Sequence, residues 1–299
     1  MTEKTPPVCN YEGSDYQTSF WDEGGRAYED AAEAIVLRRL LPKDGGDLML
    51  ELGAGAGRNS PRYRNYEKVV LLDYSRTQLQ QARDRLGVTG RYIYVAADVY
   101  RLPFVDRLFD GATMIRTLHH MAEPELALEQ VNQVMSPQGT FILEFANKRN
   151  FKAILRYFLR KQDWSPYSQE PIEFTDLNFD FHPKAVRRYL KDVGFAIEKQ
   201  RTVSHFRVGF LKRNLPAKTL AGLDGLLQWT GSFAQFSPSV FTRAKVLGTG
   251  QQPAEGSFFK CPACGAALEG MGQDLKCGAC GETWEYRDGI YDFRVKESK

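Results

Sequence analysis

Strands and helices are predicted to alternate over the first half of the chain, and this alternation constrains the fold more than any other feature. Five apolar segments have the length and composition of buried strands: residues 47–52, 68–73, 91–98, 109–115 and 139–146. Segments with helical spacing of apolar residues lie before or between them: residues 26–41, 75–87 and 124–135. This order predicts a parallel sheet covered by helices on both faces. Right-handed crossovers then bring the carboxyl ends of the strands to one edge, where ligands bind.

Local signals support the predicted helix ends. Ser75 is placed to cap the helix over 75–87 and Gly87 to end it, and Pro42 stops the helix over 26–41. The chain has 299 residues, of which 42% are hydrophobic, enough for one large core with a small module.

Charge and hydropathy exclude some classes of protein. A net charge of +3 is too weak to indicate nucleic-acid binding by itself. No continuous apolar run approaches the roughly 18–20 residues of a membrane-spanning helix. The first sixteen residues, MTEKTPPVCNYEGSDY, lack the layout of a secretory signal, so a cytoplasmic location is expected.

A glycine-rich turn follows the first predicted strand. The stretch ELGAGAG (51–57) has the pattern E-x-G-x-G-x-G. The dinucleotide pattern G-x-G-x-x-G fails, because Arg58 stands at its sixth position. Glycines in the observed pattern allow the backbone to approach a ligand that has no pyrophosphate.

Two carboxylates follow the next two strands. Asp73 lies at the end of the second strand and suits a bidentate hydrogen bond to two ribose hydroxyls. A dinucleotide and a nucleoside ligand without pyrophosphate both offer such hydroxyls, so Asp73 alone does not distinguish them. Asp98, after the third strand, can accept from an exocyclic amino group such as that of adenine. Together with the glycine turn, they describe a pocket for an adenosine with a zwitterionic tail.

The segment from 47 to 146 resembles the class I S-adenosylmethionine-dependent methyltransferases, above all the ubiquinone/menaquinone-biosynthesis C-methyltransferases and related small-molecule enzymes. The resemblance rests on five motifs: ELGAGAG (51–57), LLDYS (71–75), AADVYRLPF (96–104), FDGATMIRTLHHM (109–121) and MSPQGTFILE (135–144). It implies a Rossmann-like α/β fold with a seven-stranded sheet of order 3-2-1-4-5-7-6, in which strand seven is antiparallel. A helix over 180–195 and strands over 196–206 and 239–247 supply the remaining elements.

The resemblance also implies which residues hold the cofactor. At the end of the first strand, Glu51 would face the methionine ammonium group. The backbone of Gly53, Ala54, Gly55 and Gly57 would line the methionine and the ribose.

Further implied contacts come from the next three strands. Asp73 would bind the ribose hydroxyls and Tyr74 would pack on the adenine. Asp98 would accept from the adenine amino group with the Val99 backbone beside it, and the Arg116 backbone would form part of the floor.

Methyl transfer asks little of the protein, since the sulfonium is already activated and a general base is optional. His119 and His120, after the fourth strand, are the candidates for such a base. The alternative is that both histidines only cap or pack. The stretch Arg116-Thr117-Leu118-His119 lacks the Asn/Asp-Pro-Pro-aromatic pattern of amino methyltransferases that act on adenine or glutamine. Methylation of such an amino group is therefore disfavoured.

The domain organisation follows from these elements. Residues 1–15 are expected to be a disordered tail and 16–247 the methyltransferase domain. An N-terminal lid is predicted from five residues, although these aromatics could equally pack on the sheet edge: Tyr16, Phe20, Trp21, Arg26 and Tyr28.

Two inserts, 150–183 and 211–238, carry substrate information. The first contains a basic amphipathic helix, which can rest on a membrane surface, grip anions or pack one face in the core. Together the inserts indicate a roomy, aromatic-lined pocket for an amphiphilic acceptor.

Four of the five cysteines lie near the end of the chain, after a flexible linker over 248–257. The two C-x-x-C pairs can bind one structural zinc ion with a tetrahedron of thiolates, in a zinc ribbon over 258–299. They are Cys261, Cys264, Cys277 and Cys280. A redox dithiol and two disulfides are the alternatives. Cys9, in the tail, is expected to have no role.

The stretch WEYRDGIYDF (284–293) resembles the ending of the small zinc-ribbon proteins that serve as activator subunits of methyltransferases. Related ribbons occur at the N-terminus of ribosomal-RNA guanine methyltransferases. In this chain the ribbon follows the methyltransferase-like segment instead of preceding it, and Tyr291 replaces the usual proline. Both differences weaken an inference of RNA binding. The resemblance leaves four roles open: docking on the catalytic domain, recruiting a partner protein, touching RNA, or stabilising the chain.

Three functions are compatible with these patterns. The first is transfer of a methyl group from S-adenosylmethionine to a small-molecule or lipid-like acceptor. The second is methylation of ribosomal or transfer RNA that the ribbon recognises. The third is a non-catalytic module that binds S-adenosylmethionine.

Overall fold

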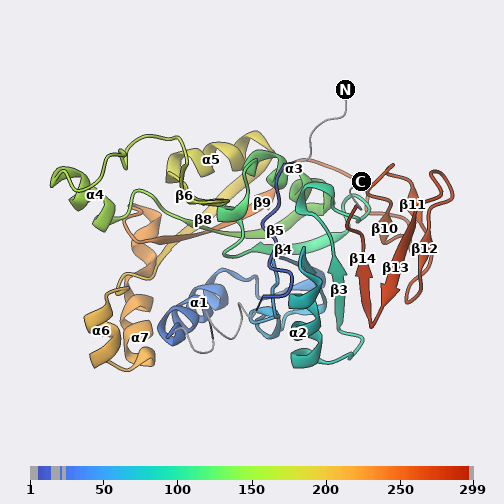
Figure 1. Cartoon of the computed structure of the whole chain (residues 1–299), viewed down its shortest axis with the longest axis horizontal. Helices are drawn as coiled ribbons and strands as arrows, with labels where there is room; N and C mark the ends of the chain where they lie inside the picture. Colours follow the sequence, from blue (N-terminus) through green and yellow to red (C-terminus); the bar gives the residue numbers. More distant parts are fainter. Residues whose placement is uncertain (1–5, 15–20, 22–24, 296–299) are drawn as a thin grey trace.

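The structure is a computed structural model that describes residues 6–14, 21 and 25–295. Its centre is one ten-stranded sheet with the order β12-β13-β14-β3-β2-β1-β4-β5-β9-β8 (Figure 1). The strands of this sheet are β1 (Gly46–Leu52), β2 (Tyr66–Asp73), β3 (Tyr92–Ala96), β4 (Phe109–Met114), β5 (Met135–Ala146), β8 (Phe195–Val203), β9 (Ser239–Val246), β12 (Leu275–Lys276), β13 (Thr283–Arg287) and β14 (Ile290–Asp292). Two small antiparallel pairs accompany it: β6 (Ile172–Thr175) with β7 (Asn178–Asp180), and β10 (Phe259–Lys260) with β11 (Ala267–Leu268).

The first seven strands of the sheet confirm the predicted methyltransferase topology. Strands β1 to β5 run parallel to one another. Strand β9 lies between β5 and β8 and is antiparallel to both. Within this part of the chain β8 and β9 are the sixth and seventh strands. The observed order is therefore 3-2-1-4-5-7-6.

Helices cover both faces of the sheet, as the alternation of elements predicted. They are α1 (Ala27–Leu40), α2 (Arg76–Leu86), α3 (Pro124–Val134), α4 (Phe151–Phe158), α5 (Pro183–Asp192), α6 (Gly209–Asn214) and α7 (Ala217–Leu227). Short 3₁₀ helices are η2 (Ser60–Arg62), η3 (Val99–Arg101), η4 (Leu118–His120) and η5 (Gln228–Ser232). None of the helices in the described residues is long and apolar enough to cross a membrane.

Alternating side chains of β1 divide the core between the two faces. Leu48 and Leu50 pack in the cluster that contains α3 and α5, whereas Met49 packs in the cluster that contains α2. A third cluster joins α1 and α7 to β5 and β9. Figure 1 shows α3 and α5 on one side of the sheet and α1 and α2 on the other. Strands buried on both faces explain why the sequence reads as continuous apolar runs.

The predicted helix signals act as expected at α2. The Ser75 side chain accepts a hydrogen bond from the Gln78 backbone amide, and Gly87 follows the helix with a φ of 78°. The third strand is shorter than the predicted 91–98, because the Asp98 side chain caps η3 and accepts from the Tyr100 amide.

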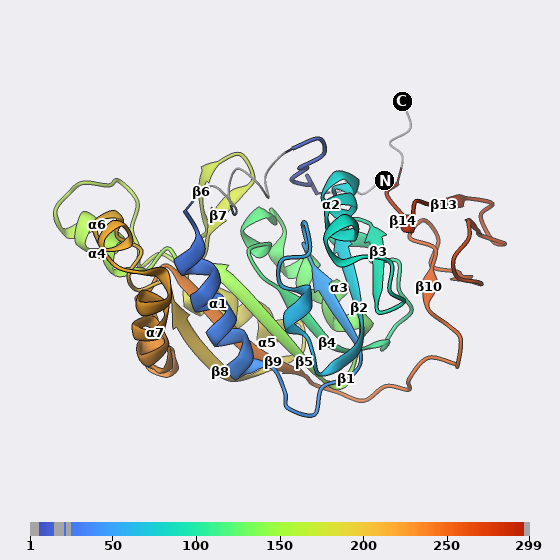
Figure 2. The same cartoon turned by 90° about the horizontal axis from the view of Figure 1, so that it is seen from below.

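The cysteine-rich ribbon is docked on the sheet. Strand β14 runs parallel to β3 and pairs Ile290 with Tyr94 and Asp292 with Ala96, so β3 is not an edge strand. Figure 2 shows β10, β13 and β14 beside β3 at the end of the molecule opposite α4 and α6. The preceding residues, 248–257, form no helix or strand. The boundaries of the linker and the ribbon stay predictions.

Apolar packing joins the ribbon to the rest of the sheet. Phe259 stacks on Phe104 with ring centroids 5.8 Å apart, and Phe104 meets Phe109 of β4 edge to face. Phe293 also belongs to this cluster, which continues into the central core. The ribbon and the α/β core therefore share one sheet and one hydrophobic core.

Residues 6–14 lie over the carboxyl edge of the sheet. The Glu12 carboxylate accepts from the backbone amides of Arg76 (2.9 Å) and Thr77 (3.1 Å), at the N-terminus of α2, and pairs with Arg294 of the ribbon at 3.1 Å. A carboxylate is favourable there because the helix N-terminus has unpaired amides and positive potential. Residues 1–15 were expected to be a disordered tail, but residues 6–14 make these contacts with α2 and the ribbon.

We expect the ribbon to unfold together with the sheet. Ile290→Ala removes a fully buried side chain next to Tyr94, and should lower the free energy of unfolding by about 2–5 kcal/mol. The exposed Val88→Ala is the control, with a change of about 0.5 kcal/mol or less. Chemical denaturation measures both. A separate early transition for the ribbon, with the main transition unchanged in Ile290→Ala, would show that the two parts fold independently.

Candidate functional site

The glycine turn after β1 has the backbone geometry that requires glycine. Gly53, Gly55 and Gly57 all have a positive φ, of 65°, 52° and 71°. A Cβ on Gly53 would lie 2.1 Å from Oγ1 of Thr117, so the turn packs directly on the residue that follows β4 by three positions. A Cβ on Gly55 would meet no atom closer than 3.9 Å. Gly55 is therefore open on the side where a ligand would approach.

Asp73 fixes this turn from the end of β2. One carboxylate oxygen accepts from the Gly55 amide at 2.8 Å and the other from the Ser75 amide at 2.9 Å. Each carboxylate oxygen has a further lone pair, so these bonds leave capacity for hydroxyl donors. Burial raises the pKa of Asp73, and the two amides oppose that rise.

A buried, unpartnered oxygen faces the same turn. Gln78 of α2 is 2% exposed, and its amide nitrogen donates to the backbone oxygen of Ser14 at 3.2 Å. Its Oε1 has no hydrogen-bond partner among the described residues. A buried oxygen without a partner costs about 1–3 kcal/mol, which a ligand that brings an N–H or O–H donor would relieve.

Glu51 lies beneath the turn and is almost fully buried. Its carboxylate accepts from the Tyr63 hydroxyl at 3.1 Å and from the Ser60 hydroxyl. Burial raises the pKa of Glu51 to about 7 despite these two donors. A nearby ammonium group would favour the ionised form and lower that pKa.

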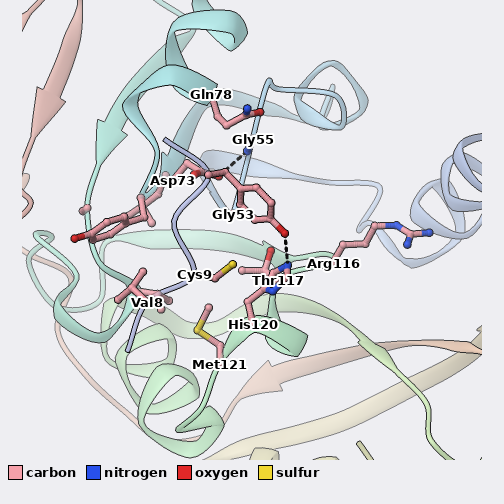
Figure 3. Close-up of a pocket in the computed structure, with 15 residues that line it drawn as sticks. Val8, Cys9, Gly53, Gly55, Asp73, Gln78, Arg116, Thr117, His120 and Met121 are labelled. Carbon is pink, nitrogen blue, oxygen red and sulfur yellow. Dashed lines mark hydrogen bonds between the residues drawn. The ribbon is translucent and has the colours of Figure 1, made fainter. Parts of the chain in front are cut away.

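The remaining predicted cofactor residues differ in placement. Figure 3 shows the cavity at the carboxyl edge, and Tyr74 and Val99 line it. Asp98 does not line it, because its side chain turns back to cap η3, although Ala97 and Val99 beside it do. Ala54 lines a second, adjoining pocket together with Glu51.

Arg116 lies at the boundary between these two pockets. Its φ is 56°, and its backbone amide donates to Glu144 of β5 at 2.9 Å. Its guanidinium and that of Arg58 both pair with the buried Glu33 of α1. Burial alone would raise the pKa of Glu33, but the two guanidinium groups hold it below its usual range.

The predicted lid residues take three different positions. Trp21 packs against Arg58 and Arg116, with ring centroid to guanidinium distances of 3.6 and 4.9 Å, and lines the Glu51 pocket. Tyr28 is buried and donates to Asp224, so it packs in the core. Arg26 pairs with Glu29 at 3.6 Å. Tyr16 and Phe20 lie outside the described residues.

The two candidate histidines are not equivalent. His120 lines the cavity, and His119 does not; their rings lie 4.0 Å apart. His120 Nδ1 lies 2.9 Å from the Leu177 carbonyl oxygen, which can only accept, so Nδ1 carries the proton. Nε2 is then the acceptor and faces the cavity. Burial lowers the pKa of both histidines, that of His119 well below the usual range.

Part of the N-terminal segment occupies the cavity. The Tyr11 hydroxyl donates to His120 Nε2 at 3.1 Å, as the dashed line in Figure 3 shows. Val8 and Cys9 line the cavity beside it, so Cys9, for which no role was expected, lies at the site. The remaining cavity holds about 100 Å³, less than the roughly 300–1,000 Å³ of small-molecule pockets.

Sequence reasoning missed several residues of the site: Val8, Cys9, Tyr11, Gln78, Thr117 and Met121. Gln78 had a usable signal, since it follows the predicted cap Ser75 by three residues and so lies in the first turn of α2. Thr117 and Met121 lie within the motif at 109–121, beside the residues that were chosen from it. The contacts of residues 8–11 link distant parts of the chain, which no local pattern indicates.

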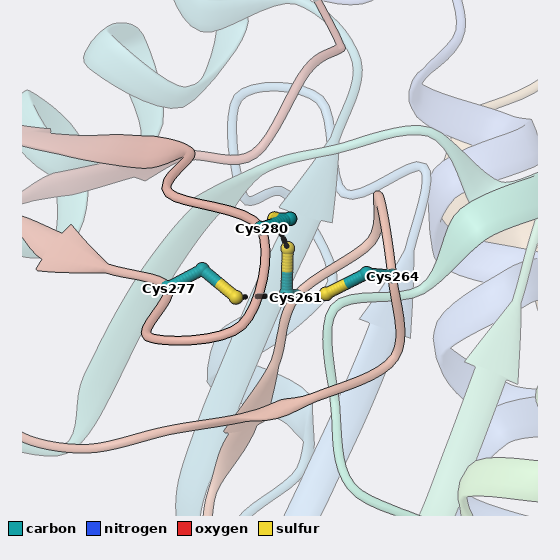
Figure 4. Close-up of side chains that lie close together, drawn as sticks. All are labelled: Cys261, Cys264, Cys277 and Cys280. Carbon is teal, nitrogen blue, oxygen red and sulfur yellow. Dashed lines mark hydrogen bonds between the residues drawn. The ribbon is translucent and has the colours of Figure 1, made fainter.

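The four ribbon cysteines converge on one point (Figure 4). Their sulfur atoms all lie within 4.8 Å of one another, with 3.7 Å between Cys261 and Cys280 and 3.5 Å between Cys264 and Cys277. A zinc ion with four thiolates at about 2.3 Å requires sulfur separations of about 3.8 Å. A disulfide requires about 2.05 Å. The arrangement fits a tetrahedral metal ion and not two disulfides.

Comparison with known proteins agrees with this geometry. Residues 50–143 match the sequence model of a family described as a methyltransferase domain. The chain is 28% identical to 27-O-demethylrifamycin SV methyltransferase of Amycolatopsis mediterranei over 138 residues, 44% of this chain and 51% of the relative. It is 32% identical to the ubiquinone/menaquinone biosynthesis C-methyltransferase UbiE of Teredinibacter turnerae over 113 residues, 35% of this chain and 45% of the relative. The chain thus spans about half the length of the curated relatives it matches.

A solved structure shares the fold over most of the chain. It is a chain of the complex between the Haloferax volcanii Trm112 methyltransferase activator and a methyltransferase, with a TM-score of 0.54 and 18% identity, covering 78% of this chain and 98% of that one. Residues 50–143 thus match a methyltransferase domain in sequence, and the chain has the α/β fold of this solved structure.

We expect Gly53→Ala to destabilise the protein more than Gly55→Ala. Both alanines adopt a strained positive φ, but only the first meets Thr117. The overpacking should lower the free energy of unfolding by about 1–3 kcal/mol beyond the loss in Gly55→Ala. Chemical denaturation of the two variants measures the difference. Equal losses would mean that the turn does not depend on its contact with Thr117.

Proposed function

We propose that this protein is an enzyme that transfers the methyl group of S-adenosylmethionine to a small-molecule or amphiphilic acceptor. The observation that carries the proposal is the meeting of three features in one cavity. They are the open face of Gly55, the Asp73 carboxylate and the unpartnered Gln78 oxygen. The relatives are a 27-O-demethylrifamycin SV methyltransferase and a C-methyltransferase of ubiquinone/menaquinone biosynthesis, which supports a small-molecule acceptor.

The residues fit an adenosine with a zwitterionic tail. Asp73 and Gln78 offer acceptors to ribose hydroxyls, and Glu51, beneath the turn, offers a carboxylate to the methionine ammonium group. Gly53, Ala54 and Gly55 would line the methionine and ribose through their backbone. Gly57 lines neither pocket, because it packs against Leu71, Ala82 and Leu86.

Tyr74 and Val99 would flank the adenine, and the Arg116 backbone would form the floor. Asp98 caps η3 and does not line the cavity, so its side chain would have to leave the Tyr100 amide to accept from the adenine amino group.

Cofactor entry in this proposal requires movement of residues 8–11. The space they leave is about 100 Å³, and Tyr11 occupies the acceptor side of His120. Glu12 anchors the segment on α2 and on Arg294 through exposed or half-buried contacts, which are weak and exchangeable. The segment therefore competes with the ligand.

The bound cofactor supplies an activated methyl group on a sulfonium. The chain excludes water and orients the acceptor toward that group. His120 Nε2, once Tyr11 has left, can accept the proton of an acceptor hydroxyl or carbon acid. His119 lies behind it and serves as packing in this proposal, so His120 alone retains the role of base.

Labelled methyl donor tests the function. We expect transfer from methyl-labelled S-adenosylmethionine to the lipid or small-molecule fraction of a cell extract, and at least a ten-fold lower rate in Asp73→Ala. Label in the RNA fraction alone would favour the RNA alternative. Cofactor binding without transfer to any fraction would favour the non-catalytic one.

The net negative charge of the ribbon disfavours RNA as the acceptor. Residues 258–295 contain six Asp and Glu against four Lys and Arg, whereas RNA-binding surfaces are basic. The cytoplasmic location stays a prediction.

We infer instead that the ribbon acts within the chain, as a covalently attached counterpart of an activator. The similar solved structure comes from a complex of an activator with a methyltransferase. Here β14 pairs with β3, and Arg294 contacts both Glu12 and the Tyr74 backbone oxygen. The ribbon thereby supports the loop that would hold the adenine. A separate protein partner is not required.

We expect one zinc ion per chain, held by the four ribbon cysteines. Cys277→Ser should lose the metal and lower the melting temperature, because the thiolate cluster organises the two knuckles. Cys9→Ser, which alters the remaining cysteine, should keep the full zinc content. Elemental analysis and thermal unfolding measure both. Purified wild-type protein with four titratable ribbon thiols and no metal would contradict the assignment.

A further inference from the structure

The end of the molecule opposite the ribbon carries an exposed apolar surface. Phe151, Leu155 and Phe158 of α4 are spaced by four and three residues and so share one helix face. They are 69, 48 and 69% exposed, and Ala153 is the buried residue of this helix. The sequence left open whether this helix packs in the core or on a surface. Its apolar face points to solvent.

Neighbouring elements extend this surface. Val208 and Phe210, at the start of α6, are 51 and 65% exposed, and Trp229 and Phe233, at η5, are 56 and 80% exposed. Figures 1 and 2 both place α4, α6 and α7 at the same end of the molecule. Scattered exposed apolar residues are ordinary, but a group from three adjacent elements marks an interaction site.

A cavity opens between these elements. It holds about 770 Å³ and is lined by Phe151 and Arg156 of α4, Arg207 and Val208 before α6, and Phe236 after η5. Its lining also includes Ala146, the last residue of β5, and Asp180, the last residue of β7. The volume is within the range of small-molecule pockets.

The same elements concentrate positive charge. Segments 150–161 and 205–220 contain four Lys and Arg each and no Asp or Glu, in a chain whose net charge is only +3. Lys212 pairs with Glu29 at 2.8 Å and so faces the core. The others in exposed positions include Lys152, Arg160, Lys161, Arg213 and Lys218.

We propose that this end of the molecule docks on the surface of an anionic lipid bilayer. Aromatic and aliphatic side chains of amphipathic helices enter the boundary between headgroups and acyl chains, while Lys and Arg bind the anionic headgroups. A protein interface explains the surface less well, because Lys is depleted at protein interfaces, although Arg and aromatic residues are not. The combination of exposed Phe, Trp and Leu with exposed Lys and Arg matches a bilayer.

Docking in this orientation turns the cavity mouth between α4 and α6 toward the lipid. An acceptor with an apolar body and an anionic group could then pass from the bilayer to the carboxyl edge, with Arg156 and Arg207 along its path. This consequence for the acceptor rests on the proposed methyltransferase function. The docking itself does not.

Vesicle co-sedimentation of the full-length protein tests the proposal without any enzymatic readout. We expect at least ten-fold tighter binding to vesicles of phosphatidylcholine with phosphatidylglycerol than to phosphatidylcholine alone, and weaker binding at high salt. Leu155→Ser with Phe158→Ser should weaken binding to the anionic vesicles at least ten-fold. These two residues line neither cavity, and their exposure means that the variant should fold.

The matched control is Val88→Ser with Met271→Ser. These side chains are 73 and 48% exposed and lie outside α4, α6 and η5, so this variant should bind vesicles like the wild type. Equal binding of the wild type to both kinds of vesicle, or of the α4 variant and the wild type to the anionic vesicles, would overturn the proposal. So would a lipid-free dimer that the α4 variant converts to monomers, since the surface would then join two copies of this chain.

Discussion

The tight turn after β1 is the constraint on which the site depends. Gly53 packs on Thr117 without room for a Cβ, and Asp73 binds the amides of Gly55 and Ser75. These contacts join the ends of β1, β2 and β4 at one edge of the sheet. Because three strands are fixed there together, the open face of Gly55, the Gln78 oxygen and His120 Nε2 all line one cavity.

The two ends of the sheet differ in what covers them. At one end β14 pairs with β3, which removes an unpaired strand edge and fixes the ribbon in the common core. At the other end the inserts after β5 and β8 leave apolar side chains in solvent around a large cavity. The first end stabilises the loops that would hold the cofactor. The second is where a substrate or a surface can be recognised.

Periodic and local features could be predicted from the sequence. The Ser75 cap and the convergence of the four cysteines each follow from spacing over a few residues or from a motif with a defined geometry. The strand order follows from the resemblance of five motifs to the class I methyltransferases. Contacts between distant segments could not. Tyr11 meets His120 across 109 residues, and α4 has an amphipathic pattern that fits a core helix and a surface helix equally well.

The most direct test of the central claim is a calorimetric titration of the full-length protein with S-adenosylhomocysteine, with NAD as the control ligand. The account predicts micromolar binding of S-adenosylhomocysteine, no binding of NAD, and loss of binding in Asp73→Ala. Equal affinity for S-adenosylhomocysteine in Asp73→Ala and wild type would contradict the assignment of the glycine turn and Asp73 as the cofactor site.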